Sequence, residues 1–306
     1  MRILFMGTPD IAAASLQALL DAGHTVCGVF TRQDKPVGRK QLLTAPPVKR
    51  LAEANGIPVW QPATLRDGTA ADTLRALAPE LIVVVAYGRI LPPEILAIPP
   101  RGCINLHVSL LPRYRGSAPI QWAVLNGDAE TGVTIMQLDE GCDTGAILLV
   151  RKVPIDPEET SGELFDKVSA LGAQTLVTAI EKLAAGELTP KKQDDALATQ
   201  APPLKKEMAA FAFDADAAHL HNLVRGMNPW PVAYFERDGK KIKVLASRLA
   251  PNAAGAAPGT VLAVRPLTVA CQNGALQLIT VTPEGGKPMD GTAWAAGRRL
   301  KAGDCL

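Results

Sequence analysis

Asn105 and His107 are the residues of this chain whose types and spacing most directly suggest chemistry. Between Gly102 and Leu110 apolar and polar residues alternate, which is typical of a strand with one apolar and one polar face. In such a strand the Asn105 amide and the His107 imidazole project from the same face, about 6 to 7 Å apart. A hydrogen-bond donor and a group that exchanges protons can then reach one small reacting group.

The residues after this strand favour a site over a purely structural role. Leu111 and Pro112 stop the strand, and a basic loop with one tyrosine follows at residues 113–116. Strand ends in α/β sheets are the places where ligands and catalytic groups gather. An isolated histidine is more often a satisfied core or surface residue, and on these residues alone that interpretation of His107 stays open.

Asp143 lies in an acidic loop bounded by Gly141 and Gly145, where an aspartate is usually a turn residue. Asn-x-His-x-Ser-Leu-Leu-Pro followed by Gly-Cys-Asp-Thr-Gly nevertheless resembles the signature of the formyltransferases that use 10-formyltetrahydrofolate. Nearly the whole chain is similar to the methionyl-tRNA formyltransferase family, through the segments MRILFMGTPDIAAASLQALL, KPVGRKQLLTAPPVK, VVAYGRILP, GSAPIQWAVLNGDAETGVTIMQLDEGCDTGAIL and NPWP.

The resemblance implies transfer of a formyl group from 10-formyltetrahydrofolate to the amino group of methionyl initiator tRNA, in support of translation initiation. It implies Asn105, His107 and Asp143 as the catalytic residues. Formyl transfer to an amine passes through a tetrahedral oxyanion, which an amide donor such as Asn105 can hold. His107 can stabilise that oxyanion or move a proton, and Asp143 can fix the imidazole or relay the proton through water.

The resemblance also implies binding residues. The folate donor is expected to contact Ser109, Leu110, Leu111 and Pro112, and a cis bond before Pro112 is conceivable. The long polar loop at residues 32–47 is expected to reach the tRNA acceptor arm through Arg39 and Lys40, because positive charge in such a loop suits phosphate. Lys205 and Lys206 are predicted to add tRNA contacts. A solvated surface loop that touches nothing is the alternative.

The N-terminal segment gives no support for a nicotinamide or flavin cofactor. Residues 2–31 are predicted to form a strand, a helix and a second strand, which is a βαβ unit of a parallel sheet. The dinucleotide fingerprint G-x-G-x-x-G is missing, because Pro9 stands where the second glycine would be. We expect the folate donor as co-substrate, and no metal, nicotinamide or flavin.

Length and patterning predict an α/β protein of two domains, since 306 residues exceed the usual size of one core. Residues 69–77 are predicted as a helix and residues 81–87, almost all Leu, Ile and Val, as a buried strand. We predict a Rossmann-like, mostly parallel sheet in a formyltransferase catalytic domain at residues 1–189. A polar, proline-containing and aperiodic linker is predicted at residues 190–206.

Residues 207–306 are predicted as a C-terminal tRNA-binding domain with five short strands. The dipeptides Asp238-Gly239 and Asn273-Gly274 are strong hairpin signals. A small β-barrel of the oligonucleotide-binding kind (OB-like) follows from these strands and from the resemblance.

The net charge of +2 is unevenly distributed along the chain. Residues 1–190 carry 17 Lys and Arg against 20 Asp and Glu, whereas residues 191–306 carry 15 against 10. A basic second part fits an enzyme whose substrate includes a polyanion, with a merely solvated surface as the alternative.

Composition bears on the expected compartment. No apolar run reaches about 18 residues, and the N-terminus lacks the apolar region of a signal peptide. The five cysteines form no Cys-x-x-Cys pair, which indicates reduced thiols. We expect a cytoplasmic protein whose partners are charged initiator methionyl-tRNA and the folate donor, with no membrane association and no obligate protein partner.

Four other functions compete with this interpretation. An N-formyltransferase for amino sugar nucleotides shares the core, although the Lys/Arg loop argues against it. A purine-pathway transformylase would lack the C-terminal domain. A hydrolase of 10-formyltetrahydrofolate would use water as the acceptor. A nucleic-acid-binding module without activity would leave Asn105, His107 and Asp143 without purpose.

Overall fold

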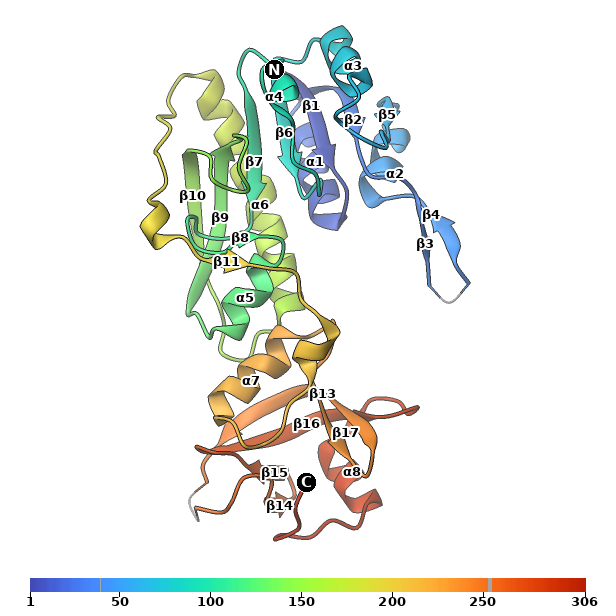
Figure 1. Cartoon of the computed structure of the whole chain (residues 1–306), viewed down its shortest axis with the longest axis vertical. Helices are drawn as coiled ribbons and strands as arrows, with labels where there is room; N and C mark the ends of the chain where they lie inside the picture. Colours follow the sequence, from blue (N-terminus) through green and yellow to red (C-terminus); the bar gives the residue numbers. More distant parts are fainter. Residues whose placement is uncertain (39, 253–254) are drawn as a thin grey trace. The chain divides into compact units, whose positions relative to one another are not determined.

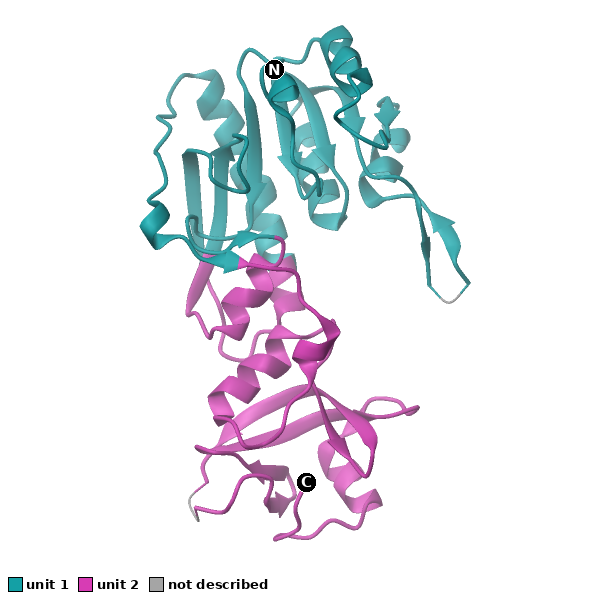
Figure 2. Ribbon diagram, viewed as in Figure 1, with its two compact units in different colours: residues 1–116, 132–153, 166–200 teal, residues 117–131, 154–165, 201–306 magenta. Residues whose placement is uncertain are grey.

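The computed structural model describes residues 1–38, 40–252 and 255–306. The chain divides into two compact units, shown in different colours in Figure 2. Unit 1 comprises residues 1–116, 132–153 and 166–200, and unit 2 comprises residues 117–131, 154–165 and 201–306. Each unit has a hydrophobic core of its own.

A seven-stranded sheet with the order β10-β9-β7-β6-β1-β2-β5 forms the centre of unit 1 (Figure 1). Pairing is parallel between β1 and β2, β1 and β6, β2 and β5, and β6 and β7, whereas β9 runs antiparallel to β7. This mostly parallel sheet confirms the predicted α/β class. The strands are β1 (Arg2–Gly7), β2 (Thr25–Phe30), β5 (Val59–Trp60), β6 (Leu81–Val85), β7 (Cys103–His107), β9 (Glu130–Gln137) and β10 (Ile147–Pro154).

The sheet and its helices follow from their apolar patterns. All five residues of β6 are buried, as expected for an apolar strand covered on both faces. The first helix buries residues at helical spacing, which are Ile11, Ala12, Ser15, Leu16 and Leu19. Unit 1 contains the helices α1 (Asp10–Asp21), α2 (Pro47–Ala54), α3 (Thr69–Leu77) and α4 (Pro93–Leu96). Helix α6 (Ser161–Ala184) begins in unit 2 and continues in unit 1. No helix among the described residues is long and apolar enough to cross a membrane.

Residues 32–47, predicted as a long loop, contain a hairpin of β3 (Lys35–Val37) and β4 (Leu42–Thr44). The two strands are antiparallel, with Val37 opposite Leu42. Gly38 turns the chain with φ +72°, a conformation that glycine adopts without strain. Arg39 lies outside the described residues.

Unit 2 contains an antiparallel sheet with the order β12-β13-β16-β15-β14, with β17 beside β16. Asp238-Gly239 joins β12 to β13, and Asn273-Gly274 joins β15 to β16, which confirms both predicted hairpins. Among the described residues β12 and β14 do not pair, so the sheet is open. The strands are β12 (Tyr234–Arg237), β13 (Lys240–Ala250), β14 (Val261–Val264), β15 (Leu267–Ala270), β16 (Ala275–Pro283) and β17 (Met289–Asp290).

The helices of unit 2 are α5 (Pro119–Leu125), α7 (Ala217–Gly226) and α8 (Gly291–Gly297). The Asp216 carboxylate caps α7 by accepting from the backbone N–H of Ala218, and Asp290 caps α8 in the same way. Trp294 of α8 packs against Phe235 of β12, with ring centroids 6.0 Å apart.

The segment 190–206, predicted as an extended linker, is more ordered than its composition suggests. It contains the 3₁₀ helix η1 (Asp195–Leu197) and the short strand β11 (Gln200–Ala201), and η2 (Lys206–Ala209) begins at its end. The backbone N–H of Arg115, in β8 (Arg115–Gly116), donates to the carbonyl of Thr199 at 2.8 Å. Residues up to Gln200 belong to unit 1.

Candidate active site

The central strand β7 carries both Asn105 and His107. It lies between β6 and β9, and His107 is opposite Thr134 of β9. Asn105 is 8% exposed and His107 is 6% exposed. A strand that is paired on both edges holds two side chains of the same face at a fixed separation. The predicted pair is therefore built on rigid backbone.

The strand ends at His107, although the alternating pattern predicts that it continues to Leu110. Side-chain hydrogen bonds replace the ladder beyond that point. The hydroxyl of Ser109 donates to the Arg113 carbonyl at 2.6 Å. Thr134 Oγ1 donates to the Ser109 carbonyl at 2.7 Å and accepts from the Leu111 N–H at 3.2 Å. These side-chain bonds to the backbone, one from within the loop and two from Thr134 of β9, take the place of the strand ladder and turn the chain into a loop.

The His107 ring is oriented by the loop that follows. Its Nε2 lies 2.9 Å from the carbonyl oxygen of Tyr114. A carbonyl oxygen only accepts, so Nε2 carries a hydrogen and Nδ1 is the nitrogen that takes up or gives away a proton. Nδ1 lies 3.7 Å from Asp143 Oδ2, which is longer than a direct hydrogen bond. A water between them, or a small movement of either side chain, would complete the contact.

Asp143 is held by its own loop and by the segment around Gly116. Its Oδ2 accepts from the Gly116 N–H at 2.8 Å and from the Cys142 thiol at 3.7 Å. Its backbone has φ +57°, a left-handed conformation that residues other than glycine rarely adopt. Residues held in such conformations cluster at functional sites.

The thiol of Cys142 interacts with the Asp143 carboxylate. Partial burial, followed by the charge of Asp143 and the hydrogen bond to it, raises the pKa of Cys142 above its ordinary value. A raised pKa lowers the thiolate fraction near neutral pH, so Cys142 is poorly suited to act as a nucleophile.

The Asn105 amide is available to a ligand. Its side chain makes no hydrogen bond to any of the described residues. Its nitrogen and oxygen are also not fully buried, so a small ligand can reach them. A bound substrate oxygen would accept a hydrogen bond from this amide, which fits the oxyanion role expected of Asn105.

The predicted folate-binding residues follow β7 directly. Ser109 and Leu111 are buried and form hydrogen bonds to Arg113 and Thr134, respectively. Leu110 and Pro112 are partly exposed. The peptide bond between Leu111 and Pro112 is cis. Folate binding by these four residues stays a prediction.

The predicted tRNA-binding residues are spread over both units. Lys40 is exposed at the turn of the β3–β4 hairpin in unit 1. Lys205 and Lys206 are exposed at the start of η2 in unit 2. The structure therefore brings the three predicted catalytic residues together in unit 1, whereas the predicted tRNA contacts are divided between the two units.

Two buried polar residues beside Asp143 are not predicted from the sequence. Arg115 is 6% exposed and Gln193 is 5% exposed. Arg115 belongs to the basic loop after the strand, which is a weak signal. Gln193 lies in a segment whose composition predicts a linker, so no sequence signal marks it.

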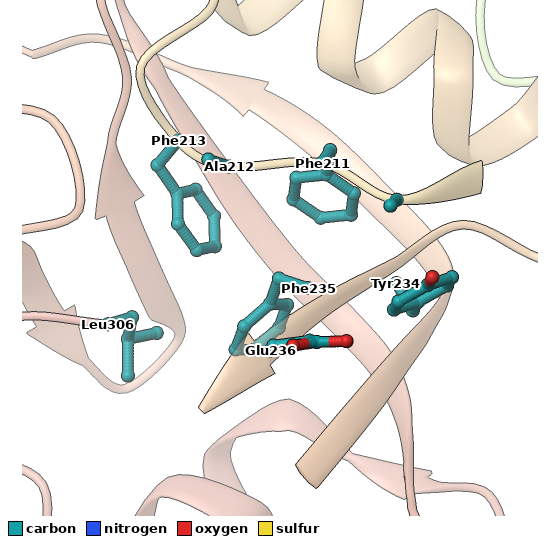
Figure 3. A pocket seen from close by; sticks show the side chains of 8 residues that line it. Phe211, Ala212, Phe213, Tyr234, Phe235, Glu236 and Leu306 are labelled. Atoms are coloured by element: carbon teal, nitrogen blue, oxygen red, sulfur yellow. The ribbon is translucent and has the colours of Figure 1, made fainter. Parts of the chain in front are cut away.

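A further pocket is lined by residues of unit 2 alone (Figure 3). Phe211 and Phe213 face Phe235, with ring centroids 5.9 and 5.2 Å from it. The lining is mostly apolar and includes none of the predicted catalytic or folate-binding residues. It consists of Ala210, Phe211, Ala212, Phe213, Tyr234, Phe235, Glu236 and Leu306.

Both the N-terminal and the C-terminal part of the chain match a known protein family. A family described as formyl transferase matches residues 1–180, and a second, described as formyl transferase, C-terminal domain, matches residues 203–299. The chain belongs to the formyl transferase family. Among its relatives, the methionyl-tRNA formyltransferase of Moorella thermoacetica is 48% identical over 308 residues, covering 100% of this chain and 99% of that protein. The methionyl-tRNA formyltransferase of Stutzerimonas stutzeri is 49% identical, covering 94% of this chain and 92% of that protein.

Two solved structures share the fold at lower identity. An N-formyltransferase from Helicobacter canadensis, in complex with folinic acid and dTDP-3-aminofucose, has a TM-score of 0.67 at 19% identity, covering 90% of this chain and 97% of that one. HypX from Aquifex aeolicus, in complex with tetrahydrofolic acid, has a TM-score of 0.64 at 16% identity, covering 96% of this chain and 47% of that one. At these identities the similarity shows the fold alone.

Proposed function

We propose that this formyl transferase family member transfers the formyl group of 10-formyltetrahydrofolate to the amino group of methionyl initiator tRNA, in support of translation initiation. The observation that carries the proposal is the identity of nearly one half with methionyl-tRNA formyltransferases over almost the whole of both chains. The unpartnered Asn105 amide and the His107–Asp143 pair supply groups that this reaction requires.

Asn105 is proposed to hold the oxyanion. The donor supplies the formyl group, and attack of the methionyl amine on the formyl carbon turns the carbonyl oxygen into an oxyanion. The Asn105 N–H groups can donate to that oxygen without any change of their own charge. One such donor contributes roughly 10²- to 10³-fold in rate.

His107 and Asp143 are proposed to manage the protons. The attacking amine loses a proton, and the departing folate nitrogen gains one. Because Nε2 is bound to the Tyr114 carbonyl, these transfers would pass through Nδ1. The Asp143 carboxylate, 3.7 Å from Nδ1, would stabilise the ring when Nδ1 is protonated and relay a proton through water.

We also propose a role for each domain of the chain. Residues 1–189 would form the catalytic domain, with the folate donor against Ser109, Leu110, Leu111 and Pro112. Residues 207–306 would form the tRNA-binding domain, joined through residues 190–206. The open antiparallel sheet of unit 2 has the hairpins of an OB-like domain, a fold that is itself only partly closed. We further propose that the enzyme is cytoplasmic, without membrane association or an obligate protein partner.

An acceptor of the amino sugar nucleotide class is the second candidate. The N-formyltransferase from Helicobacter canadensis shares the fold, but at 19% identity. The exposed β3–β4 hairpin with Lys40 favours tRNA, because phosphate-rich nucleic acid is bound through Lys and Arg contacts.

Replacing Arg39 with alanine is expected to weaken the salt dependence of tRNA recognition. If the loop at residues 32–47 contacts phosphates through Arg39 and Lys40, KM for charged tRNA rises steeply with salt, since binding releases counterions. Arg39→Ala should raise that KM and flatten its slope, and should spare the KM for the folate donor. Kinetics at two ionic strengths measure this.

The matched control for this experiment is Arg66→Ala, which removes the same charge from an exposed position elsewhere in unit 1. It should leave the salt slope unchanged. Identical KM, kcat and slope for Arg39→Ala and the unmodified enzyme would remove the loop from the tRNA contact and strengthen the sugar nucleotide candidate.

A further inference from the structure

We propose that Gln193 is a positioning residue that holds the loop carrying Asp143, and that Arg115 orients Gln193 in turn. The inference rests on the proposed function, in which Asp143 acts beside His107. Gln193 lies in the segment predicted as a linker, yet it is 5% exposed. A buried amide is stable only when its polar atoms have partners.

The Gln193 side chain uses its whole hydrogen-bonding capacity. Its Nε2 donates to the carbonyl oxygens of Asp143 and Gly145, each at 2.8 Å. Its Oε1 accepts from Arg115 Nε at 3.1 Å and from Arg115 Nη2 at 2.8 Å. A guanidinium only donates and a carbonyl only accepts, so these partners fix which end of the amide is the oxygen.

The loop held by Gln193 is one that needs support. Asp143 has the left-handed φ of +57°, and such strained conformations persist only where the surroundings hold them. A Cβ at Gly145 would collide with the carbonyl of Gln137, so the turn has no room to relax on that side. One amide that binds the carbonyls on both sides of Thr144 fixes the direction of the turn, and with it the direction of the Asp143 side chain.

Arg115 connects this support to His107. Its Nη2 also binds Asp195 Oδ1 at 2.7 Å, which anchors the guanidinium from the other side. The residue before it, Tyr114, accepts the His107 hydrogen bond, and the residue after it, Gly116, donates to Asp143 Oδ2. Both proposed proton-handling residues are therefore held by the same three-residue segment, and Gln193 links that segment to the backbone of Asp143.

The variant that tests this inference is Gln193→Glu, which keeps the shape and the Arg115 contact. It replaces the Nε2 donor with an oxygen that faces two carbonyl oxygens, so the Asp143 turn loses its support. A misplacement of about 1 Å can cost roughly 10²-fold in rate. We expect kcat to fall by about 10- to 100-fold, with the KM values for the folate donor and charged tRNA unchanged.

The matched control is Gln200→Glu, an exposed glutamine in the same segment with the same change of charge. It should keep the kcat of the unmodified enzyme. Gln193→Met, which removes the donors without adding charge, should lower kcat as Gln193→Glu does, and it supplies the test if Gln193→Glu folds poorly. Normal kcat in a folded Gln193 variant would overturn the inference.

A double variant separates positioning from general damage. If Gln193 acts through Asp143, adding Gln193→Glu to Asp143→Asn should lower kcat no further than Asp143→Asn alone. Losses that multiply, or a loss of folate affinity equal to the loss of kcat, would overturn the positioning role while leaving the proposed function intact. An Asp143→Asn variant with the kcat of the unmodified enzyme would overturn both the positioning role of Gln193 and the catalytic role of Asp143, and would leave the identity of the formyl acceptor to be tested separately.

Discussion

Replacing His107 with alanine is expected to lower kcat by about 10²- to 10⁴-fold, the range that proton transfer by a positioned side chain contributes. The reason is the geometry of the ring. The Tyr114 carbonyl holds Nε2, so Nδ1 is the only ring nitrogen left to exchange the proton between the amine and the departing nitrogen. Steady-state kinetics with charged initiator tRNA and 10-formyltetrahydrofolate measure the effect.

The matched control for His107→Ala is His219→Ala, which removes an exposed imidazole from α7 and should leave kcat unchanged. Binding of the folate donor by His107→Ala, measured separately, should stay close to that of the unmodified enzyme, because the ring acts on charge that develops in the transition state. A kcat close to that of the unmodified enzyme would reject His107 as a proton-transfer group.

Asp143→Asn is the second change with a large expected effect. Asparagine keeps the size of the side chain, and its oxygen can still accept from the Gly116 N–H, so the loop is preserved. What disappears is the negative charge 3.7 Å from His107 Nδ1. We expect kcat to fall by at least about 10²-fold, because the protonated ring loses its partner and a relay through the carboxylate is no longer available.

The matched control for Asp143→Asn is Glu140→Gln, which neutralises an exposed carboxylate in the same loop. It should keep kcat, since the carboxylate that lies close to the His107 ring is that of Asp143. If both substitutions lowered kcat equally, the general negative charge of the loop would be responsible, and the assignment of Asp143 to His107 would fail.

Local patterns predict the central parts of this fold well. The helix at Thr69–Leu77 has the predicted bounds, and the apolar run at 81–87 gives the buried strand β6. The two hairpin dipeptides of unit 2 lie where the strands turn. In each case the spacing of apolar residues, or the positive φ that glycine can adopt, is enough to specify the local structure. Contacts with distant residues change the outcome little.

Other features depend on contacts between distant residues, which a pattern cannot express. The alternation through Leu110 predicts a longer strand, but the Thr134 hydroxyl binds the Ser109 and Leu111 backbone and ends β7 at His107. Gln193 looks like part of a polar linker, and only the partners Asp143, Gly145 and Arg115 make it a buried residue. The unit 2 sheet is likewise open because its first and last strands do not pair among the described residues, and the number of strands alone does not predict this.

The candidate site shows the same division. The alternation of apolar and polar residues along the strand is enough to place Asn105 and His107 on one face. That Asp143 lies beside His107 follows from a family resemblance and not from spacing, and the structure gives the atoms involved, Nδ1 and Oδ2. The tautomer of His107 depends on the Tyr114 carbonyl, for which the sequence contains no signal.

The acceptor of the formyl group is the measurement that tests the central claim most directly. The enzyme would be given 10-formyltetrahydrofolate with a labelled formyl group, and charged initiator methionyl-tRNA, an amino sugar nucleotide, or water alone as acceptor. We predict rapid appearance of label on the methionyl amine of the tRNA, and much slower labelling of the sugar nucleotide or release of formate. Label that accumulates faster on the amino sugar, or as free formate, would contradict the proposed function.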